Sequence, residues 1–374
     1  MRDEPASVAS PLFSADAGAL ARVKDAIGRD GGWWPFDRFM AFALYEPGLG
    51  YYARGDVIFG AMPNGPEGVS DFVTAPELSP LFGRALAAQL DQALSATTTH
   101  DVWEFGAGSG ALAAELLATL GDRVSRYHVV EVSGALQARQ QRRLAPFGDR
   151  VCWHSTWPEV LDGVVVGNEV LDAMPVRLLH FDGRQWFERG VAVSDGSLVW
   201  ADRPTDLRPP VDAPFVPGTV TEIHPQAQAW VRSLGERLRQ GAVFLVDYGF
   251  PEAEYWLPQR HGGTLMCHRA HRADANPLLD VGLKDITAHV DFTGIAVAGQ
   301  DAGLEVLGYT SQARFLLNCG LVPLLEATDV RERAMAQKLI QEHEMGELFK
   351  VIGFVKGPWF DALGFADGDR SHRL

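Results

Sequence analysis

The stretch Asp101–Leu112, which reads DVWEFGAGSGAL, constrains the fold of this chain more than any other. A short apolar run with a single acid meets three glycines at alternate positions, Gly106, Gly108 and Gly110, and an alanine- and leucine-rich segment follows. This order predicts a buried strand, a tight turn and a helix. Glycines adopt positive φ and leave the backbone open to a ligand, and the start of a helix offers free N–H groups. The stretch is therefore typical of a nucleotide-like ligand lying across the top of a parallel sheet.

Glu104 helps to distinguish between the ligands that such a turn can hold. Gly106, Gly108 and Ala111 also satisfy the G-x-G-x-x-A pattern of dinucleotide-binding folds. However, Glu104 lies just before the first glycine, where its charge would oppose a pyrophosphate and attract a cationic ligand. The pattern E-x-G-x-G-x-G resembles the first motif of Rossmann-like methyltransferases that use S-adenosylmethionine (SAM), which carries an ammonium and a sulfonium group. A glycine-rich turn without any ligand is the alternative.

Two later positions are candidates for the same ligand. The segment Tyr127–Val132 predicts a second strand, and Glu131 at its end follows the glycines by about 20 residues, which suits binding of both ribose hydroxyls. A surface carboxylate is the alternative for Glu131. Trp157 follows a third expected strand, Val151–His154, and either flanks the adenine or closes the edge of the sheet.

A second group of polar residues follows another buried strand. Asn168, Glu169 and Asp172 come directly after the apolar run Gly163–Gly167. If the next turn is helical, the two acids share one face. Two carboxylates at the mouth of a parallel sheet are costly to bury unless a cation or several donors meet them. Capping of a helix by Asn168 and Asp172 is the alternative interpretation.

Net charge and composition argue against several functions. The formal net charge is −15 and the isoelectric point is near 5.1, which disfavours nucleic-acid binding and suits a basic partner. No apolar run approaches the ~20 residues of a membrane span. Cys152, Cys267 and Cys319 show neither metal nor disulfide spacing. The N-terminal residues resemble neither a secretory signal nor, because of their acids, a mitochondrial presequence, so we expect a cytoplasmic protein.

The polar segment Arg260–Phe292 contains four histidines and Cys267. It lacks the HExxH and CxxC patterns of zinc sites, and His268 with His271 is its only histidine pair at helical spacing. We therefore expect a substrate-facing loop or a polar cap here, and no metal.

The overall pattern predicts an α/β protein with a Rossmann-like core, in which a mostly parallel sheet is flanked by helices, and with an inserted antiparallel accessory lobe. From Val176 to Trp200 the hydrophobic period changes to two, and Asp182–Gly183 and Asp195–Gly196 are typical of hairpin turns. Helices are expected over Thr310–Leu321 and Glu326–Met345. The expected division is a helical and loop segment capping the active site at 1–95, a SAM-binding core at 96–181 and 241–374 with an inserted polar loop at 260–292, and an accessory meander and helix at 182–240.

Seven blocks of sequence form a family pattern that covers most of the chain. They are FMAFALYEPGLGYY (Phe39–Tyr52), DFVTAPELSPLFG (Asp71–Gly83), EFGAGSGALA (Glu104–Ala113), YHVVEVS (Tyr127–Ser133), GNEVLDAMPV (Gly167–Val176), VDYGF (Val246–Phe250) and GTLMCHRAHRADANPLLDVGLKDITAHVDF (Gly263–Phe292). Together they resemble the MidA-like SAM-dependent methyltransferases, whose mitochondrial member assists assembly of respiratory complex I by methylating an arginine. EFGAGSG alone indicates a SAM enzyme, whereas NEVLDAMP with KDITAHVDF is more specific.

This resemblance implies a SAM-dependent methyltransferase that acts on an arginine of a partner protein. Glu169 and Asp172 are the first candidates to grip the guanidinium, at a methyl-transfer mouth that includes Asn168. The candidate residues are, for catalysis, Asn168, Glu169, Asp172 and His289; for SAM, Glu104, Gly106, Gly108, Gly110, Glu131, Trp157 and Asn168; and for the substrate, Asp71, Glu77, Asp247, Tyr248 and Asp291.

Several alternatives stay open at this point. The partner could be a subunit of a respiratory complex, and the chain could form a homodimer. A non-catalytic assembly factor that only binds SAM, a nicotinamide-dependent oxidoreductase and a methyltransferase for small molecules are the competing functions. Intact Glu104, Glu131 and Glu169 argue against a decayed site, and Glu104 argues against a nicotinamide nucleotide.

Overall fold

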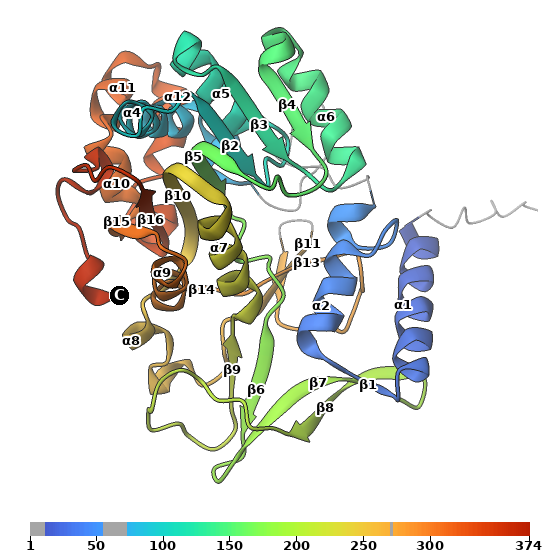
Figure 1. Ribbon diagram of the computed structural model, residues 1–374. Helices are drawn as coiled ribbons and strands as arrows, with labels where there is room; N and C mark the ends of the chain where they lie inside the picture. Colours follow the sequence, from blue (N-terminus) through green and yellow to red (C-terminus); the bar gives the residue numbers. More distant parts are fainter. Residues whose placement is uncertain (1–11, 55–72, 270–271) are drawn as a thin grey trace, which may run out of the picture.

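A mixed eight-stranded sheet forms the centre of the molecule (Figure 1). The computed structural model describes residues 12–54, 73–269 and 272–374. The strand order is β15-β16-β10-β5-β2-β3-β4, with β14 paired to β10. The strands are β2 (Asp101–Phe105), β3 (Arg126–Val130), β4 (Val151–His154), β5 (Leu161–Asn168), β10 (Leu238–Phe250), β14 (Val290–Asp291), β15 (Glu305–Ser311) and β16 (Phe349–Lys356). Neighbours from β10 to β4 run parallel, and β16 is antiparallel to both β10 and β15. This sheet confirms the predicted α/β class.

Helices cover both faces of the sheet because successive strand residues point to opposite sides. On β2, Val102 packs among the residues of one apolar core and Trp103 among those of the other. The first core is closed mainly by α4 (Pro80–Ala96), α5 (Ala111–Leu120), α10 (Gln312–Asn318) and α11 (Leu321–Ala327), and the second by α7 (Pro225–Arg237) and α9 (Phe292–Asp301). The helix α6 (Gly134–Leu144) lies beside α5 near β4 (Figure 1).

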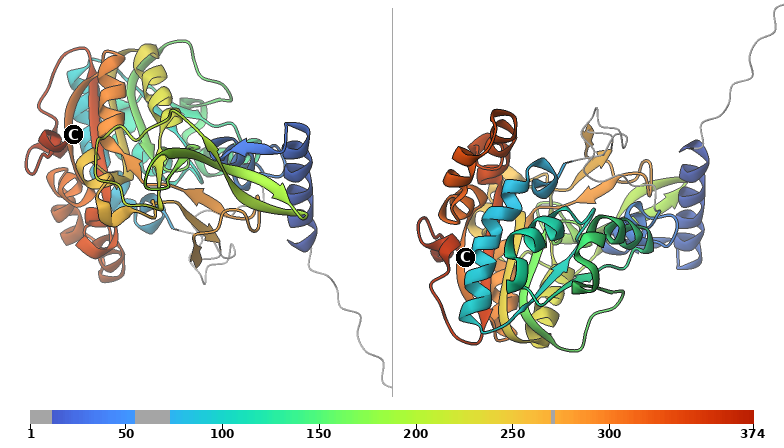
Figure 2. Two further views of the ribbon diagram at one scale, coloured as in Figure 1. Left: turned by 90° about the horizontal axis from the view of Figure 1, so that it is seen from below. Right: turned by 90° about the horizontal axis from the view of Figure 1, so that it is seen from above.

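An antiparallel accessory sheet lies beyond the main sheet, as Figure 2 shows from two sides. Its order is β1-β7-β6-β9, with β8 paired to β7. The strands are β1 (Trp33–Pro35), β6 (Arg177–Phe181), β7 (Trp186–Ser194), β8 (Ser197–Pro204) and β9 (Thr219–Ile223). The predicted hairpin turns fall between β6 and β7 and between β7 and β8, and the inserted antiparallel lobe is confirmed.

The accessory sheet and the helix α7 do not follow the expected bounds of the accessory lobe, 182–240. The accessory sheet also takes in β6 and β1, because β1 pairs with β7 from the N-terminal segment. Conversely, α7 buries Ala227, Val231 and Leu234 against the main sheet. The helix α4 likewise packs on the main sheet, although the expected boundary places it in the segment 1–95.

The N-terminal helices and a small third sheet complete the region around the strand ends. The helices α1 (Leu12–Arg29) and α2 (Phe36–Tyr45) share an apolar core with the accessory sheet, and the phenylalanines of α2 are buried there. The third sheet has the order β12-β11-β13 and lies within the expected polar loop 260–292. The remaining elements are η1 (Tyr51–Ala53), α3 (Ala75–Leu78), η2 (Gly121–Arg123), η3 (Ala145–Arg150), α8 (Glu252–Tyr255), η4 (Pro258–Arg260), β11 (Met266–Arg269), β12 (Arg272–Asp274), β13 (Asp285–Thr287), α12 (Val330–Gln337), η5 (Glu342–Gly346), η6 (Leu363–Phe365) and η7 (Ser371–Arg373).

The predicted bounds of two helices near the C-terminus were wrong. The segment Glu326–Met345 is not one helix, because the Asp329 carboxylate accepts the N–H groups of Arg331 and Glu332 and starts the separate helix α12. The helix expected from Thr310 begins only at Gln312, after a strand that we did not predict, β15. Among the described residues, no helix has the length and apolarity of a membrane span.

Candidate functional site

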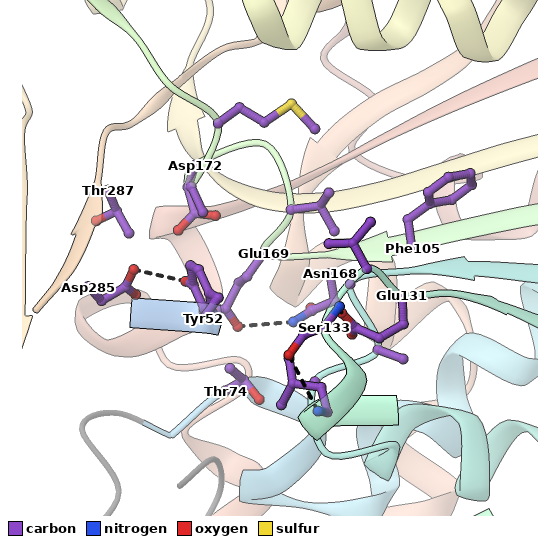
Figure 3. Close-up of a pocket in the computed structure, with 18 of the residues that line it drawn as sticks. Tyr52, Thr74, Phe105, Glu131, Ser133, Asn168, Glu169, Asp172, Asp285 and Thr287 are labelled. Atoms are coloured by element: carbon purple, nitrogen blue, oxygen red, sulfur yellow. Dashed lines mark hydrogen bonds between the residues drawn. The ribbon is translucent and has the colours of Figure 1, made fainter. Parts of the chain in front are cut away.

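A cavity of about 990 Å³ opens at the carboxyl ends of the parallel strands (Figure 3). Residues at or after the ends of β2, β3, β4 and β5 line one part of it. Residues from α2, η1, α3, α7, β10, β16 and the third sheet line much of the rest. Ligands of open α/β sheets bind in this position, because the loops that follow the strands converge there.

The glycine-rich turn borders the cavity with two of its three glycines. Gly106, Gly108 and Gly110 have φ values of 67°, 53° and 82°, which non-glycine residues rarely adopt. A Cβ atom on Gly108 would meet no atom within 4 Å, so this backbone faces open space in the cavity. Gly110 does not line the cavity and instead caps the start of α5, which corrects its predicted place beside the ligand.

Glu131 lies at the end of β3 and lines the cavity, as predicted. Its Oε1 accepts the Ser133 N–H at 2.8 Å, and its Oε2 accepts the Gln140 side-chain amide at 3.0 Å. The same Gln140 Nε2 donates to the Gly108 carbonyl at 3.1 Å. Gln140 thus connects Glu131 to the glycine-rich turn, a role that we did not predict because it resembles the other glutamines of α6.

Glu104 also lines the cavity and is buried. Its Oε2 accepts the Tyr127 hydroxyl at 2.7 Å. Burial raises the pKa of Glu104 to about 7, although the Tyr127 hydrogen bond lowers it. A cation in the cavity would favour the ionised form, which agrees with the reason for choosing Glu104 from the sequence.

Trp157 lines the cavity next to the ends of β2 and β4. Its ring lies 4.8 Å from that of Phe105 and 5.4 Å from that of Trp230, measured between centroids. Trp157 lines the cavity and also packs against the core. The structure is therefore compatible with both interpretations, a residue that flanks the adenine and one that closes the edge of the sheet.

Glu169 and Asp172 line the cavity together, although the turn that carries them is not helical. Glu169 has a φ of 54°, an uncommon value for a non-glycine residue. Its Oε1 accepts the Asn168 side-chain amide at 3.0 Å, so Asn168 does not cap a helix. The Oδ2 of Asp172 accepts the Tyr248 hydroxyl at 2.5 Å, whereas its buried Oδ1 has no hydrogen-bond partner.

The pKa values of both acids are raised above those of ordinary carboxyl groups. Burial raises the pKa of Glu169 to about 8, and the nearby charges of Asp172 and Asp285 act in the same direction. Burial also raises the pKa of Asp172 to about 6, against the hydrogen bond from Tyr248. Perturbed acids in a cleft are typical of functional sites.

Asp247 was predicted to bind substrate, and the structure contradicts this. It is fully buried, does not line the cavity, and its Oδ2 accepts the N–H groups of Val170, Leu171 and Asp172 at 3.1, 2.9 and 3.3 Å. The reason is its position on β10, directly beneath the turn that follows the neighbouring strand β5. Asp247 therefore fixes the turn that carries Glu169 and Asp172.

Asp247→Ala is expected to lower the free energy of unfolding by about 3 kcal/mol, because several buried N–H groups lose their acceptor. Asp247→Asn keeps one acceptor oxygen and should lose less. Urea denaturation measures both, with Asp301→Ala on the exposed end of α9 as the control. Equal midpoints for Asp247→Ala and the wild type would contradict this interpretation.

The other predicted residues divide between the cavity and its surroundings. Tyr248 and His289 line the cavity, and His289 Nδ1 has no hydrogen-bond partner, while burial lowers the pKa of this histidine to about 4. Glu77 lines the cavity and pairs with Arg143 at 3.0 Å. Asp291 lies buried at the start of α9 and is not among the residues that line the cavity. Asp71 lies outside the described residues.

Sequence reasoning missed a group of residues on the side of the cavity away from the glycine-rich turn. The Tyr52 hydroxyl donates to Asp285 Oδ1 at 2.8 Å, and the Tyr45 hydroxyl donates to the Ala173 carbonyl at 2.8 Å. Tyr45 and Tyr52 stack with their ring centroids 5.6 Å apart. Both tyrosines belong to a quoted family block, as does Asp285, but nothing in the sequence indicated that they meet.

The described part of the chain contains no group of three or more histidine, cysteine or acidic residues arranged to hold a metal ion. The cavity does have features that fit SAM. An open backbone at Gly108, a buried acid at the end of β3 and the raised pKa of Glu104 match a nucleoside with a cationic amino-acid end. Fold and site together therefore define the class of SAM-dependent methyltransferases.

Comparison with known proteins identifies the family. Residues 81–310, more than half of the chain, match the family described as "Putative S-adenosyl-L-methionine-dependent methyltransferase". The chain belongs to this family, and the resemblance to MidA-like methyltransferases is confirmed.

Two solved structures from Burkholderia thailandensis are similar over 99% of this chain and 100% of each of theirs. One is a "likely methyl transferase" bound to S-adenosyl-homocysteine, with 47% identity and a TM-score of 0.93. The other is an uncharacterised protein with 45% identity and a TM-score of 0.89. The methyltransferase class and the SAM cofactor are thus confirmed.

Named relatives are more distant. The mitochondrial protein arginine methyltransferase NDUFAF7 homolog of Caenorhabditis elegans is 26% identical, over 82% of this chain and 78% of its own length. Human mitochondrial NDUFAF7, also described as a protein arginine methyltransferase, is 27% identical over 82% and 75%. These names contradict the expected cytoplasmic location, because the relatives that match are mitochondrial proteins.

Proposed function

We propose that this methyltransferase acts on the guanidinium group of an arginine in a partner protein. The observation that carries the proposal is a pair of carboxylates, the buried Asp172 and the half-buried Glu169, that line one cavity. Among the described residues, no lysine or arginine lines that cavity. A buried carboxylate without a cation is costly, and a guanidinium offers both the charge and the hydrogen-bond donors that these acids lack.

Each half of the cavity has a proposed role. Gly106, Gly108 and Glu131 would hold SAM, with Trp157 beside its adenine and Glu104 near its cationic end. SAM supplies an electrophilic methyl group on a sulfonium. Glu169 and Asp172 would orient the guanidinium and concentrate its electron density on the attacking nitrogen. As the N–CH₃ bond forms and the S–CH₃ bond breaks, that nitrogen loses a proton, and the ionised carboxylate of Glu169, which lines the same cavity, can accept it.

Several finer assignments belong to this proposal. Asn168, which holds Glu169, and His289, whose Nδ1 lacks a partner, are proposed to act at the methyl-transfer mouth. The placement of Tyr45 and Tyr52 in the cavity supports a capping role for the segment 1–95. The names of the relatives support a protein substrate, and a respiratory-complex subunit is the candidate partner.

The proposal is tested by methylation of immobilised peptides that differ only in one central residue. The purified protein is incubated with methyl-labelled SAM and peptides presenting arginine, lysine, histidine or glutamine. We expect label on arginine alone, identified as methylarginine after acid hydrolysis. Label on another residue would contradict the proposal, and SAM binding without any turnover would favour a non-catalytic assembly factor.

The affinity for an arginine peptide is expected to rise with pH between about pH 6 and about pH 9, because cation binding needs ionised Glu169. Its carboxyl has a pKa of about 8 without a cation, so binding below that pH must release a proton. Calorimetry of the S-adenosyl-homocysteine complex, in buffers with different ionisation enthalpies, counts this proton. Glu169→Gln should abolish the release near pH 8, where Asp172, with a pKa of about 6, is already ionised. A pH-independent wild-type affinity would contradict the expectation.

A further inference from the structure

Asp285 and Tyr52 lie in the part of the cavity that also contains Glu169 and Asp172 (Figure 3). Asp285 is on β13 and only 3% exposed, and it still lines the cavity. Its Oδ1 accepts the Tyr52 hydroxyl at 2.8 Å. Tyr52 itself comes from η1 in the N-terminal segment, so two distant parts of the chain build this contact.

The charges in this part of the cavity have one sign. The charge of Asp285 contributes to the raised pKa of Glu169. Among the neighbouring charges, Asp285 also raises the pKa of Tyr45 the most. The neighbouring Asp172 keeps a buried oxygen, Oδ1, without a hydrogen-bond partner. A buried acceptor that is aimed into a cavity and lacks a partner indicates a ligand with donors.

We propose that Asp285, oriented by Tyr52, is a third carboxylate of the acceptor subsite and that this subsite selects a planar guanidinium. The inference rests on the proposed function and adds to it the residues that distinguish arginine from lysine. Glu169 and Asp172 approach from the turn after β5, whereas Asp285 approaches from the third sheet. The Tyr52 hydroxyl has a positioning role, because it acts through Asp285.

The shape of the subsite favours a guanidinium over an ammonium. A guanidinium spreads five N–H donors around a plane, so carboxylates on different elements can each receive one or two of them. It is also more weakly hydrated and stacks on aromatic rings, and Tyr45 with Tyr52 provides a stacked pair beside Asp285. A lysine ammonium has three donors at one point and holds its water more strongly.

The test is calorimetric titration of the full-length protein, saturated with S-adenosyl-homocysteine, with three acetylated and amidated pentapeptides. Their central residue is arginine, lysine or citrulline, and the other residues are glycine. The wild type is expected to bind the arginine peptide and to discriminate by at least about tenfold against lysine and citrulline. Citrulline keeps the shape of arginine but not its charge.

Variants then separate the roles of the two residues. Asp285→Asn should weaken the arginine peptide about tenfold, and Tyr52→Phe about threefold, because Phe keeps the ring and loses only the hydrogen bond. The double variant should be no weaker than Asp285→Asn, since Tyr52 acts through Asp285. The affinity for S-adenosyl-homocysteine should be unchanged in all three.

Asp280→Asn is the matched control. It removes the same charge from the same segment, Asp280 pairs with Arg269 outside the cavity, and asparagine tolerates its φ of 54°. Equal binding of the arginine peptide by Asp285→Asn and this control would overturn the inference while leaving the proposed function intact. A wild type that binds lysine as well as arginine would overturn the selectivity, and failure of the wild type to bind the arginine peptide would overturn the proposed function as well.

Discussion

Gly108→Val is expected to abolish SAM binding, with a loss of affinity of at least about a hundredfold. The valine side chain would clash with the ligand and not with the protein. A Cβ on Gly108 would meet no protein atom within 4 Å and would project into open space in the cavity. The substitution also forces a branched residue to a φ of 53°, which costs about 1–2 kcal/mol of stability. Calorimetric titration with SAM measures the affinity, and thermal unfolding measures the cost.

Gly148→Val separates the two effects. Gly148 has a φ of 58°, a Cβ there would also meet nothing within 4 Å, and it does not line the cavity. This control should also lose stability and should keep normal SAM affinity. If Gly108→Val, still folded, bound SAM as the wild type does, the assignment of the cofactor pocket would be wrong.

Glu169→Gln is expected to leave SAM affinity unchanged and to lower kcat by at least about a hundredfold. The amide is nearly isosteric and stays next to Asn168, so the turn should keep its shape. It cannot supply the negative charge that orients a guanidinium, nor accept the proton that leaves the attacking nitrogen. Peptide methylation under saturating SAM measures kcat, and calorimetry measures SAM affinity.

Glu305→Gln on the exposed edge of β15 is the control for this variant, because it makes the same chemical change far from the cavity. It should behave as the wild type does. Equal turnover by Glu169→Gln and Glu305→Gln would remove Glu169 from the mechanism. Loss of SAM binding in Glu169→Gln would instead move this residue to the cofactor half of the cavity.

The cofactor half of the site was predictable because its signals are local in sequence. A strand, a glycine turn and a helix lie in one continuous stretch, and the end of the next parallel strand must lie beside it, which places Glu131. The same reasoning placed Glu169 and Asp172 at the end of β5, between β2 and β10. Such predictions need only the order of strands in a parallel sheet.

The rest depends on contacts between distant segments or on the exact backbone path. Tyr52 and Asp285 are separated by 233 positions and meet only because the N-terminal segment and the third sheet approach the same cavity. Asp247 looked like a site residue because it ends an apolar run, yet its side chain turns beneath the neighbouring turn. Gly110 shares its pattern with Gly108, and only the path of the turn separates a glycine that faces ligand from one that caps a helix.

The way in which the cavity is assembled has a consequence for how new specificities arise in such a protein. The strand ends of the main sheet furnish Gly108 and Glu131, whereas η1 and β13 furnish Tyr52 and Asp285. Mutation or recombination can therefore alter the second set and leave the parallel strands untouched. An engineer seeking a different methyl acceptor would randomise η1 and β13 first, and would hold Gly108, Glu131 and Asp247 constant.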